Sequence, residues 1–151
     1  EEPFADVSFG QRWYDGAQYG YRRGVIRGIT EDSFGGELTA TRAMTAVMLW
    51  RMAGEPEAPG ESRFQDIKGG KYYTAAVIWG KRRGVGAGYG DGTFRPDAGM
   101  AWSQLELVLE RYCGEVTSFP EKGVRGEGKT TLSRGELAQV LMELEEDNKY
   151  I

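Results

Sequence analysis

The sequence of 151 residues predicts an all-α protein, a pseudo-threefold helical bundle of helix-turn-helix repeats around a central three-helix core. Three observations predict this fold. The chain matches itself after a shift of sixty residues, each copy carries two segments with helical spacing of apolar residues, and a third, shorter copy follows.

The sixty-residue shift aligns glycine, aromatic and charged positions in one register and without a gap. It pairs Phe4 with Phe64, Asp6 with Asp66, Gly28 with Gly88, Phe34 with Phe94, and Arg22-Arg23-Gly24-Val25 with Arg82-Arg83-Gly84-Val85. Identities that run through both halves in one register indicate duplicated structure. We therefore predict a single domain over 1–151, with repeat 1 at 4–55, repeat 2 at 64–115 and an abbreviated repeat 3 at 118–147.

The first helix of a copy is predicted at 12–22 and again at 71–83. In the first copy Trp13, Ala17 and Tyr21 fall on one helical face. Glycine follows each segment, at Gly24 and Gly84, where a left-handed residue commonly ends a helix. Both segments are therefore expected to end at these glycines.

The second helix is predicted at 41–53, 101–113 and 133–147. Apolar residues recur at i, i+3, i+4 and i+7, as in Leu137, Val140, Leu141 and Leu144. Three such stripes are expected to pack together as the central bundle.

Composition excludes several classes of function. The net charge is −4 and the pI is near 5.0, which disfavours nucleic acid and anionic membranes as partners. The chain has no histidine, and one cysteine cannot form an internal disulfide or a thiolate cage, so no metal site or cofactor is expected. No stretch approaches the roughly twenty apolar residues of a membrane span.

The order of motifs resembles the S-layer homology domain. Copy one carries Phe4-Ala5-Asp6-Val7, Trp13, Gly24 to Gly28, Phe34 and Thr41-Arg42-Ala43-Met44, and copy two carries Phe64-Gln65-Asp66-Ile67, Tyr73, Gly84 to Gly88 and Phe94. The resemblance implies three repeats whose grooves bind secondary cell-wall polysaccharide, often through acidic ketals such as pyruvate. It also implies an extracellular position on a bacterial cell surface.

An arginine at the start of the second helix is a binding residue of that family, and the resemblance carries it onto Arg42 and Arg134. Trp102 stands at this position in copy two. Independently of the family, Ser133 and Glu136 have the spacing of a capping box, which places Arg134 beside the positive end of a helix dipole, where a bound carboxylate is favoured. Pairing of these arginines with nearby carboxylates is the alternative.

Further candidate binding residues have structural interpretations beside the functional one. Asp6 and Asp66 either act in a groove or, as we favour, cap the helix that follows. Trp13 and Tyr73 either stack on a sugar or, more commonly for such residues, belong to the core.

Trp102 is expected to face solvent in part and to stack on sugar or on a protein partner. Gly28 and Gly88 are expected to line the grooves, while the glycines of 88–92 supply turn geometry.

The sequence thus favours a non-enzymatic module that anchors to the cell wall through an anionic polysaccharide. The alternative is a derivative of the same fold that binds a protein partner or acts as a scaffold and has lost glycan binding. A glycosidase ranks below both, because two carboxylates about 5 to 9.5 Å apart in a cleft are not indicated.

Overall fold

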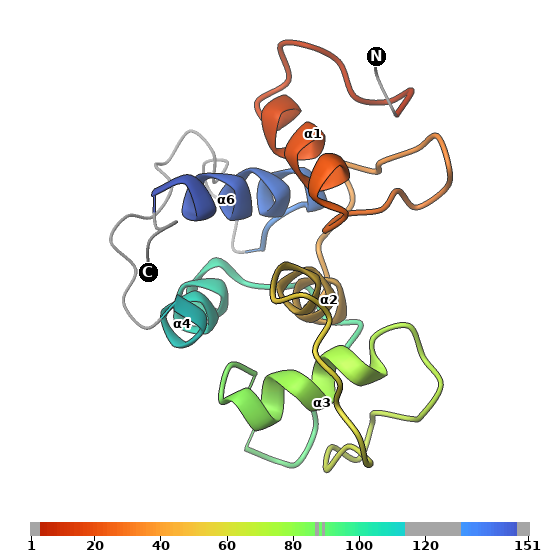
Figure 1. Cartoon of the computed structure of the whole chain (residues 1–151), viewed down its shortest axis with the longest axis vertical. Helices are drawn as coiled ribbons and strands as arrows, with labels where there is room; N and C mark the ends of the chain where they lie inside the picture. Colours follow the sequence, from red (N-terminus) through yellow and green to blue (C-terminus); the bar gives the residue numbers. More distant parts are fainter. Residues whose placement is uncertain (1–3, 87, 89, 114–130, 148–151) are drawn as a thin grey trace.

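The computed structural model describes residues 4–86, 88, 90–113 and 131–147, and within these ranges it is helical (Figure 1). The helices are α1 (Tyr14–Arg23), α2 (Arg42–Met52), α3 (Thr74–Arg83), α4 (Trp102–Cys113) and α6 (Arg134–Asp147). The predicted all-α class and these five helices are confirmed, with ends that differ from the sequence prediction by a few residues at most. The first part of the predicted repeat 3, residues 118–130, lies outside the described residues.

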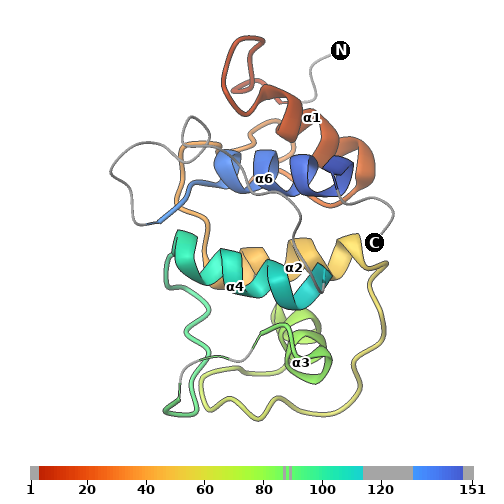
Figure 2. The ribbon, with the colours of Figure 1, turned by 90° about the vertical axis from the view of Figure 1, so that its left-hand side faces the viewer.

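The helices form three levels along the long axis of the molecule (Figures 1 and 2). Helices α1 and α6 lie against each other at one end, α2 and α4 lie in the middle, and α3 lies at the other end. The first helix of repeat 1 therefore packs on α6, and the first helix of repeat 2 packs on α2. In both described cases the first helix of a repeat packs on the second helix of a different repeat.

Glycine permits the close approach of α1 and α6. A Cβ atom on Gly16 would lie 2.5 Å from the Cα of Gln139, and the Gly16 N–H donates to the Gln139 side chain at 2.8 Å. Trp13, which is 4% exposed, lies against Gly135, where a Cβ atom would meet the indole at 2.3 Å. The interpretation of Trp13 as a core residue is confirmed.

A closed ring of backbone hydrogen bonds joins the segments that precede α2, α4 and α6. The N–H of Ala40 donates to the carbonyl of Leu132 at 2.9 Å, Met100 donates to Ala40 at 2.8 Å, and Leu132 donates to Met100 at 3.2 Å. All three residues are buried. Each segment thus gives one hydrogen bond and receives one, which is the pseudo-threefold arrangement that the sequence predicts.

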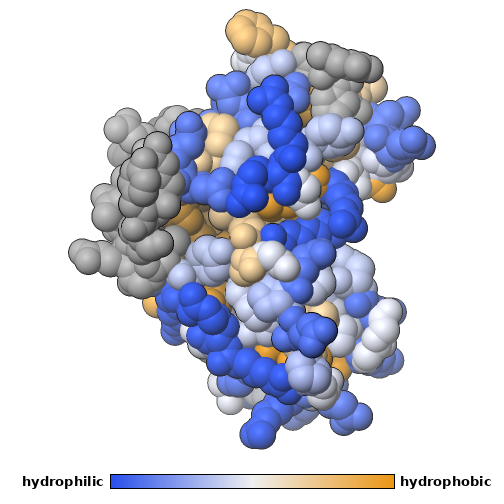
Figure 3. Space-filling view, viewed as in Figure 1, coloured by the Kyte–Doolittle hydropathy of each residue, from blue (hydrophilic) through white to orange (hydrophobic). Residues whose placement is uncertain are grey.

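The core surrounds this ring. One contiguous cluster contains residues of all three second helices, among them Leu49 of α2, Leu105 and Leu109 of α4, and Leu137 and Leu141 of α6. Each of these leucines is at most 1% exposed, so the predicted central core is confirmed. On the face shown in Figure 3, much of the described surface is hydrophilic, with small apolar areas recessed between hydrophilic side chains.

Helix ends follow the sequence signals closely. Gly24 and Gly84 have φ of 71° and 83°, so both helices end in left-handed glycines as predicted. Ser133 and Glu136 form the predicted capping box, since the Ser133 N–H donates to the Glu136 carboxylate at 2.8 Å and the Glu136 N–H donates to Ser133 Oγ at 3.1 Å.

Candidate ligand-binding grooves

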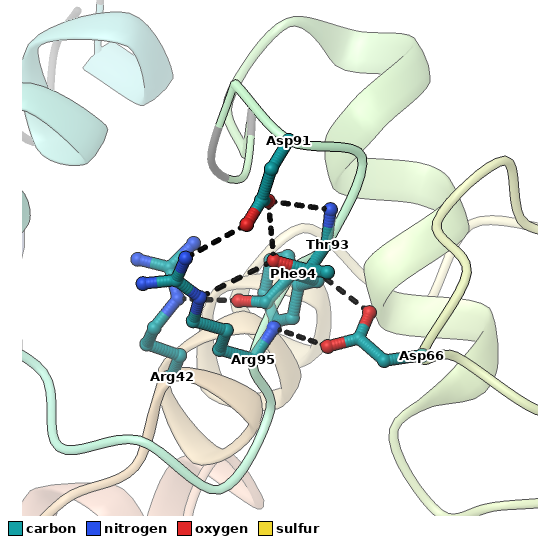
Figure 4. A network of polar contacts seen from close by, with 6 residues as sticks. All are labelled: Arg42, Asp66, Asp91, Thr93, Phe94 and Arg95. Carbon is teal, nitrogen blue, oxygen red and sulfur yellow. Dashed lines mark hydrogen bonds and ion pairs between the residues drawn. The ribbon is translucent and has the colours of Figure 1, made fainter.

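Two aspartates hold the turns that end at the repeated phenylalanines. The Asp6 carboxylate accepts from the N–H groups of Phe34 at 2.7 Å and Gly35 at 2.9 Å. The Asp66 carboxylate accepts from Phe94 at 2.9 Å and from the next residue at 2.7 Å (Figure 4). Each aspartate therefore ties the start of its repeat to a turn 28 residues later.

The prediction that Asp6 and Asp66 cap the first helices is wrong. Helices α1 and α3 begin after Trp13 and Tyr73, and neither of these two residues makes a side-chain cap. Seven residues separate each aspartate from the helix start, so its carboxylate satisfies the N–H groups of a distant turn instead.

Two buried arginines contact the same phenylalanines from the other side. Arg134 Nε donates to the Phe34 carbonyl at 3.0 Å, and Arg42 Nε donates to the Phe94 carbonyl at 2.7 Å (Figure 4). The guanidinium carbon lies 5.5 Å from the Phe34 ring centre for Arg134 and 4.7 Å from the Phe94 ring centre for Arg42. Arg134 is 5% exposed and Arg42 is 8% exposed. Each arginine thus fixes a turn that belongs to a different repeat.

These contacts place a groove between neighbouring repeats, and we name two. Groove A has a volume of about 420 Å³ and is lined by Arg27, Gly28, Ile29, Met44, Val47, Met48, Arg51, Tyr72 and Arg134. Groove B has a volume of about 210 Å³, lies among α2, α3 and α4, and includes Arg42, Gly88, Gln104, Leu107, Val108 and Arg111 in its lining. The grooves are equivalent under the sixty-residue shift, with Gly28 matched by Gly88 and Arg51 by Arg111.

Groove A brings three guanidinium groups together. Arg134 Nη2 donates to the backbone carbonyl of Arg27 at 2.9 Å, and Arg51 Nη1 donates to the carbonyl of Val25 at 3.2 Å. Arg51 Nε is buried and has no hydrogen-bond partner. The described residues that line groove A include no carboxylate. A buried cationic donor without a partner is costly, so an anion in the groove would be stabilised.

Burial changes the proton affinity of two of these arginines. It lowers the pKa of Arg51, which the charge of Arg27 lowers further, and it lowers the pKa of Arg134. Both remain charged near neutral pH because an arginine side chain loses its proton only under strongly basic conditions. An anionic ligand would reverse these unfavourable effects.

The sequence-predicted site residues lie in four places in the structure: groove A, groove B, the phenylalanine turns and the core. Arg134 and Gly28 lie together in groove A, and Arg42 and Gly88 lie together in groove B. Asp6 and Asp66 hold the phenylalanine turns and line neither groove A nor groove B. Trp13 lies in the core, and Trp102 is 6% exposed, so the expectation that Trp102 faces solvent is wrong. Trp102 joins the core because it starts α4 against the central cluster.

Three groove residues were not predicted from the sequence. Arg51 matches Arg111 under the sixty-residue shift, but a shared arginine on the second helix does not show which side of the helix meets a groove. Arg27 is matched by Ala87 under the sixty-residue shift, so copy two does not repeat this arginine. Tyr72 is 62% exposed and comes from repeat 2, yet it lines groove A beside residues of repeat 1. Only the assembled repeats bring these side chains together.

The fold and the grooves define a repeat protein with an arginine-lined groove between copies. A sequence profile of the S-layer homology domain matches residues 3–44 and 63–100, together more than half of the chain. The chain belongs to the S-layer homology family, whose domains are non-catalytic anchoring modules.

Three curated relatives agree with this assignment. The chain is 30% identical over 104 residues to cell surface glycoprotein 1 of Acetivibrio thermocellus, covering 67% of this chain and 4% of the relative. It is 24% identical over 111 residues to an amylopullulanase of Thermoanaerobacterium thermosulfurigenes, covering 74% and 6% of the two chains. It is 24% identical over 102 residues to exoglucanase XynX of Acetivibrio thermocellus, covering 68% and 9%. The chain therefore spans less than a tenth of the length of each of these relatives.

None of the helices described is both long enough and apolar enough to cross a membrane. Among the described residues, no group of three or more acidic, histidine or cysteine side chains is placed to hold a metal ion.

Proposed function

We propose that this chain anchors its protein to the bacterial cell wall by binding an anionic secondary polysaccharide in groove A. The observation that carries the proposal is the cluster of Arg27, Arg51 and Arg134, with the buried, unpartnered Nε of Arg51. Domains of this family bind cell-wall polysaccharide, and a carboxylate such as a pyruvate ketal supplies the negative charge that this cluster favours.

The three arginines have different parts in this proposal. Arg134 is fixed by two backbone carbonyls and shapes the groove. Arg51 offers a donor from the groove wall, and Arg27 is exposed and meets the ligand from solvent. Tyr72, exposed beside them, presents an aromatic face on which a sugar ring can stack. Together these groups suit a saccharide that carries an acidic substituent.

The proposal extends to the organisation and location of the chain. Residues 1–151 act as one binding body, with a third, abbreviated repeat over 118–147, on the extracellular surface. The hydrogen-bond ring through Ala40, Met100 and Leu132 supports this, because it joins segments of all three predicted copies.

A sedimentation assay with wall sacculi tests the proposed function. We expect the protein to bind intact sacculi and to lose binding when the secondary polymer is removed chemically. Binding that survives removal of the polymer would contradict the proposal. A lack of binding to both preparations would favour the alternative, a scaffold or protein-binding derivative.

A further inference from the structure

We propose that groove B is a separate docking site for a peptide segment that inserts a branched aliphatic side chain between acidic neighbours. The proposal does not depend on polysaccharide binding in groove A. It follows from one difference between the repeats, from the apolar lining of groove B and from the charges that lie in that lining.

The difference between the repeats is Ile26 in copy one and Gly86 in copy two. Ile26 is 1% exposed and packs against Gly20, where a Cβ atom would lie 2.5 Å from Ile26 Cδ1. In copy two the same pair is Gly80 and Gly86, and among the described residues a Cβ atom on Gly80 would meet only the backbone of Gly86, at 3.7 Å. Repeat 2 therefore lacks the aliphatic side chain that fills this space in repeat 1.

The space left open belongs to groove B. Both Gly80 and Gly86 line it, beside the buried side chains of Val77 and Val85. Leu107, 47% exposed, lines the same groove and extends the apolar lining to solvent. A dry apolar cavity of about 150 Å³ holds a benzene molecule. The 210 Å³ of groove B therefore has room for one branched aliphatic side chain with part of its backbone.

The charges in the lining of groove B determine which residues can flank the inserted side chain in the peptide. Arg42 and Arg111 line the groove, and the described lining residues include no carboxylate. Basic residues beside the inserted side chain would be repelled, whereas Asp or Glu would be attracted. The fitting partner is thus a protein segment of the type acid, isoleucine or a similar residue, acid.

A titration monitored by NMR tests this proposal on the full chain. The probe is the capped peptide Gly-Glu-Ile-Asp-Gly, and the readout is the amide signals of Val85 and Gly86. We expect saturable shifts of both signals, and an Ile-to-Ala peptide that binds about fiftyfold more weakly because three buried carbons are lost. A peptide with Lys in place of both acids is expected not to bind.

A variant that fills groove B with a side chain of the protein itself tests the proposal most sharply. Gly86→Ile places in repeat 2 the side chain that repeat 1 already holds, and a Cβ atom there meets Phe94 Cε1 at an ordinary 3.7 Å. This variant is expected to weaken peptide binding by at least about tenfold, since the inserted side chain loses its site. The matched control is Gly69→Ile, whose Cβ meets nothing within 4 Å, and which should bind as the original chain does.

The outcomes separate this proposal from the proposed wall binding. Unchanged peptide affinity in Gly86→Ile, or the absence of any saturable shift in the original chain, would overturn it. If Gly86→Ile does not fold, Gly86→Ala narrows the same cavity and is expected to weaken binding by an intermediate factor. If the original chain binds the peptide but does not bind sacculi, the proposed polysaccharide site in groove A is wrong and the peptide site in groove B stands.

Discussion

At the scale of single residues, one carboxylate and one guanidinium fix each repeated phenylalanine turn from opposite sides. Asp6 accepts from the Phe34 N–H, and Arg134 donates to the Phe34 carbonyl. The aspartate comes from the same repeat as the turn, and the arginine comes from a different one. The position of a groove thus depends on a chain of charge-assisted hydrogen bonds.

Replacing Asp6 tests that chain of contacts. Asp6→Ala leaves the N–H groups of Phe34 and Gly35 without their acceptor, so we expect the free energy of unfolding to fall by about 1 kcal/mol near neutral pH. Equilibrium unfolding in urea measures this change in the free energy of unfolding. Glu37→Gln, an exposed change outside the network, should have little effect. An equal loss in both variants would show that the Asp6 contacts do not stabilise the fold.

The effect of Asp6→Ala should also depend on pH. Burial raises the pKa of Asp6, but the hydrogen bonds from Phe34, Gly35 and Ser33 outweigh it, and the pKa falls below its ordinary value of 3.8. A depressed pKa in the folded state gives stability that is complete above the unfolded pKa and is lost as pH falls through the folded pKa. The difference between the original chain and Asp6→Ala should therefore shrink in acid, and a difference that grew would contradict this sign.

The sequence identified Arg134, Arg42 and the groove glycines, because their motif order is repeated. It did not identify Arg51 or Tyr72, since exposure of a helical side chain depends on which neighbouring repeat covers it. It also misplaced Trp102, because a helix start in a repeat protein can face the core. Those features become visible only when the repeats are packed.

At the scale of elements, the two described first helices carry a glycine at the equivalent position, but its surroundings differ. Gly20 in α1 makes room for Ile26, whereas a Cβ atom on Gly80 in α3 would make an ordinary contact with the backbone of Gly86, at 3.7 Å. Helix ends were predicted well because caps depend on neighbouring residues, as with Gly24 and the box of Ser133 and Glu136. Packing partners were not predicted, since each first helix rests on a helix from a different repeat.

Alanine at these two glycines should have opposite effects. Gly20→Ala forces a Cβ atom to within 2.5 Å of Ile26, so we expect a loss of about 1–3 kcal/mol. Gly80→Ala meets no close atom and removes a flexible residue from a helix, so we expect a gain of about 0.5–1 kcal/mol. Thermal or urea unfolding of both variants, compared with the original chain, measures these changes in stability. Similar losses in both variants would refute the assignment of an open cavity to repeat 2.

The helix caps offer a second matched pair. Ser133→Ala removes the hydroxyl that accepts from Glu136 and should cost about 1 kcal/mol. Ala101 occupies the equivalent position in copy two, and the return hydrogen bond survives there because the Ala101 N–H donates to Gln104 Oε1 at 3.3 Å. Ala101→Ser supplies the missing hydroxyl and should raise stability by a similar amount. A destabilised Ala101→Ser variant would show that the two helix starts are not equivalent.

At the scale of the whole molecule, the hydrogen-bond ring predicts cooperative unfolding. Leu132 lies on the ring, and Leu132→Ala should cost about 2–5 kcal/mol as a buried truncation. Because the tryptophans lie in repeats 1 and 2, tryptophan fluorescence reports on segments distant in sequence from Leu132. We expect fluorescence and far-UV circular dichroism to show one coincident, shifted transition. Separate transitions would indicate that the repeats unfold independently.

We propose that the arginine cluster of groove A holds an anionic wall polysaccharide. The most direct measurement is the affinity of Arg27→Glu for wall sacculi, compared with Arg22→Glu. Both side chains are exposed and both changes alter the net charge equally, but only Arg27 lines groove A. We predict that Arg27→Glu weakens binding by at least about tenfold, since it sets a carboxylate against the acidic ligand, while Arg22→Glu binds nearly as the original chain does. Equal affinities of the two variants for sacculi would contradict polysaccharide binding in groove A.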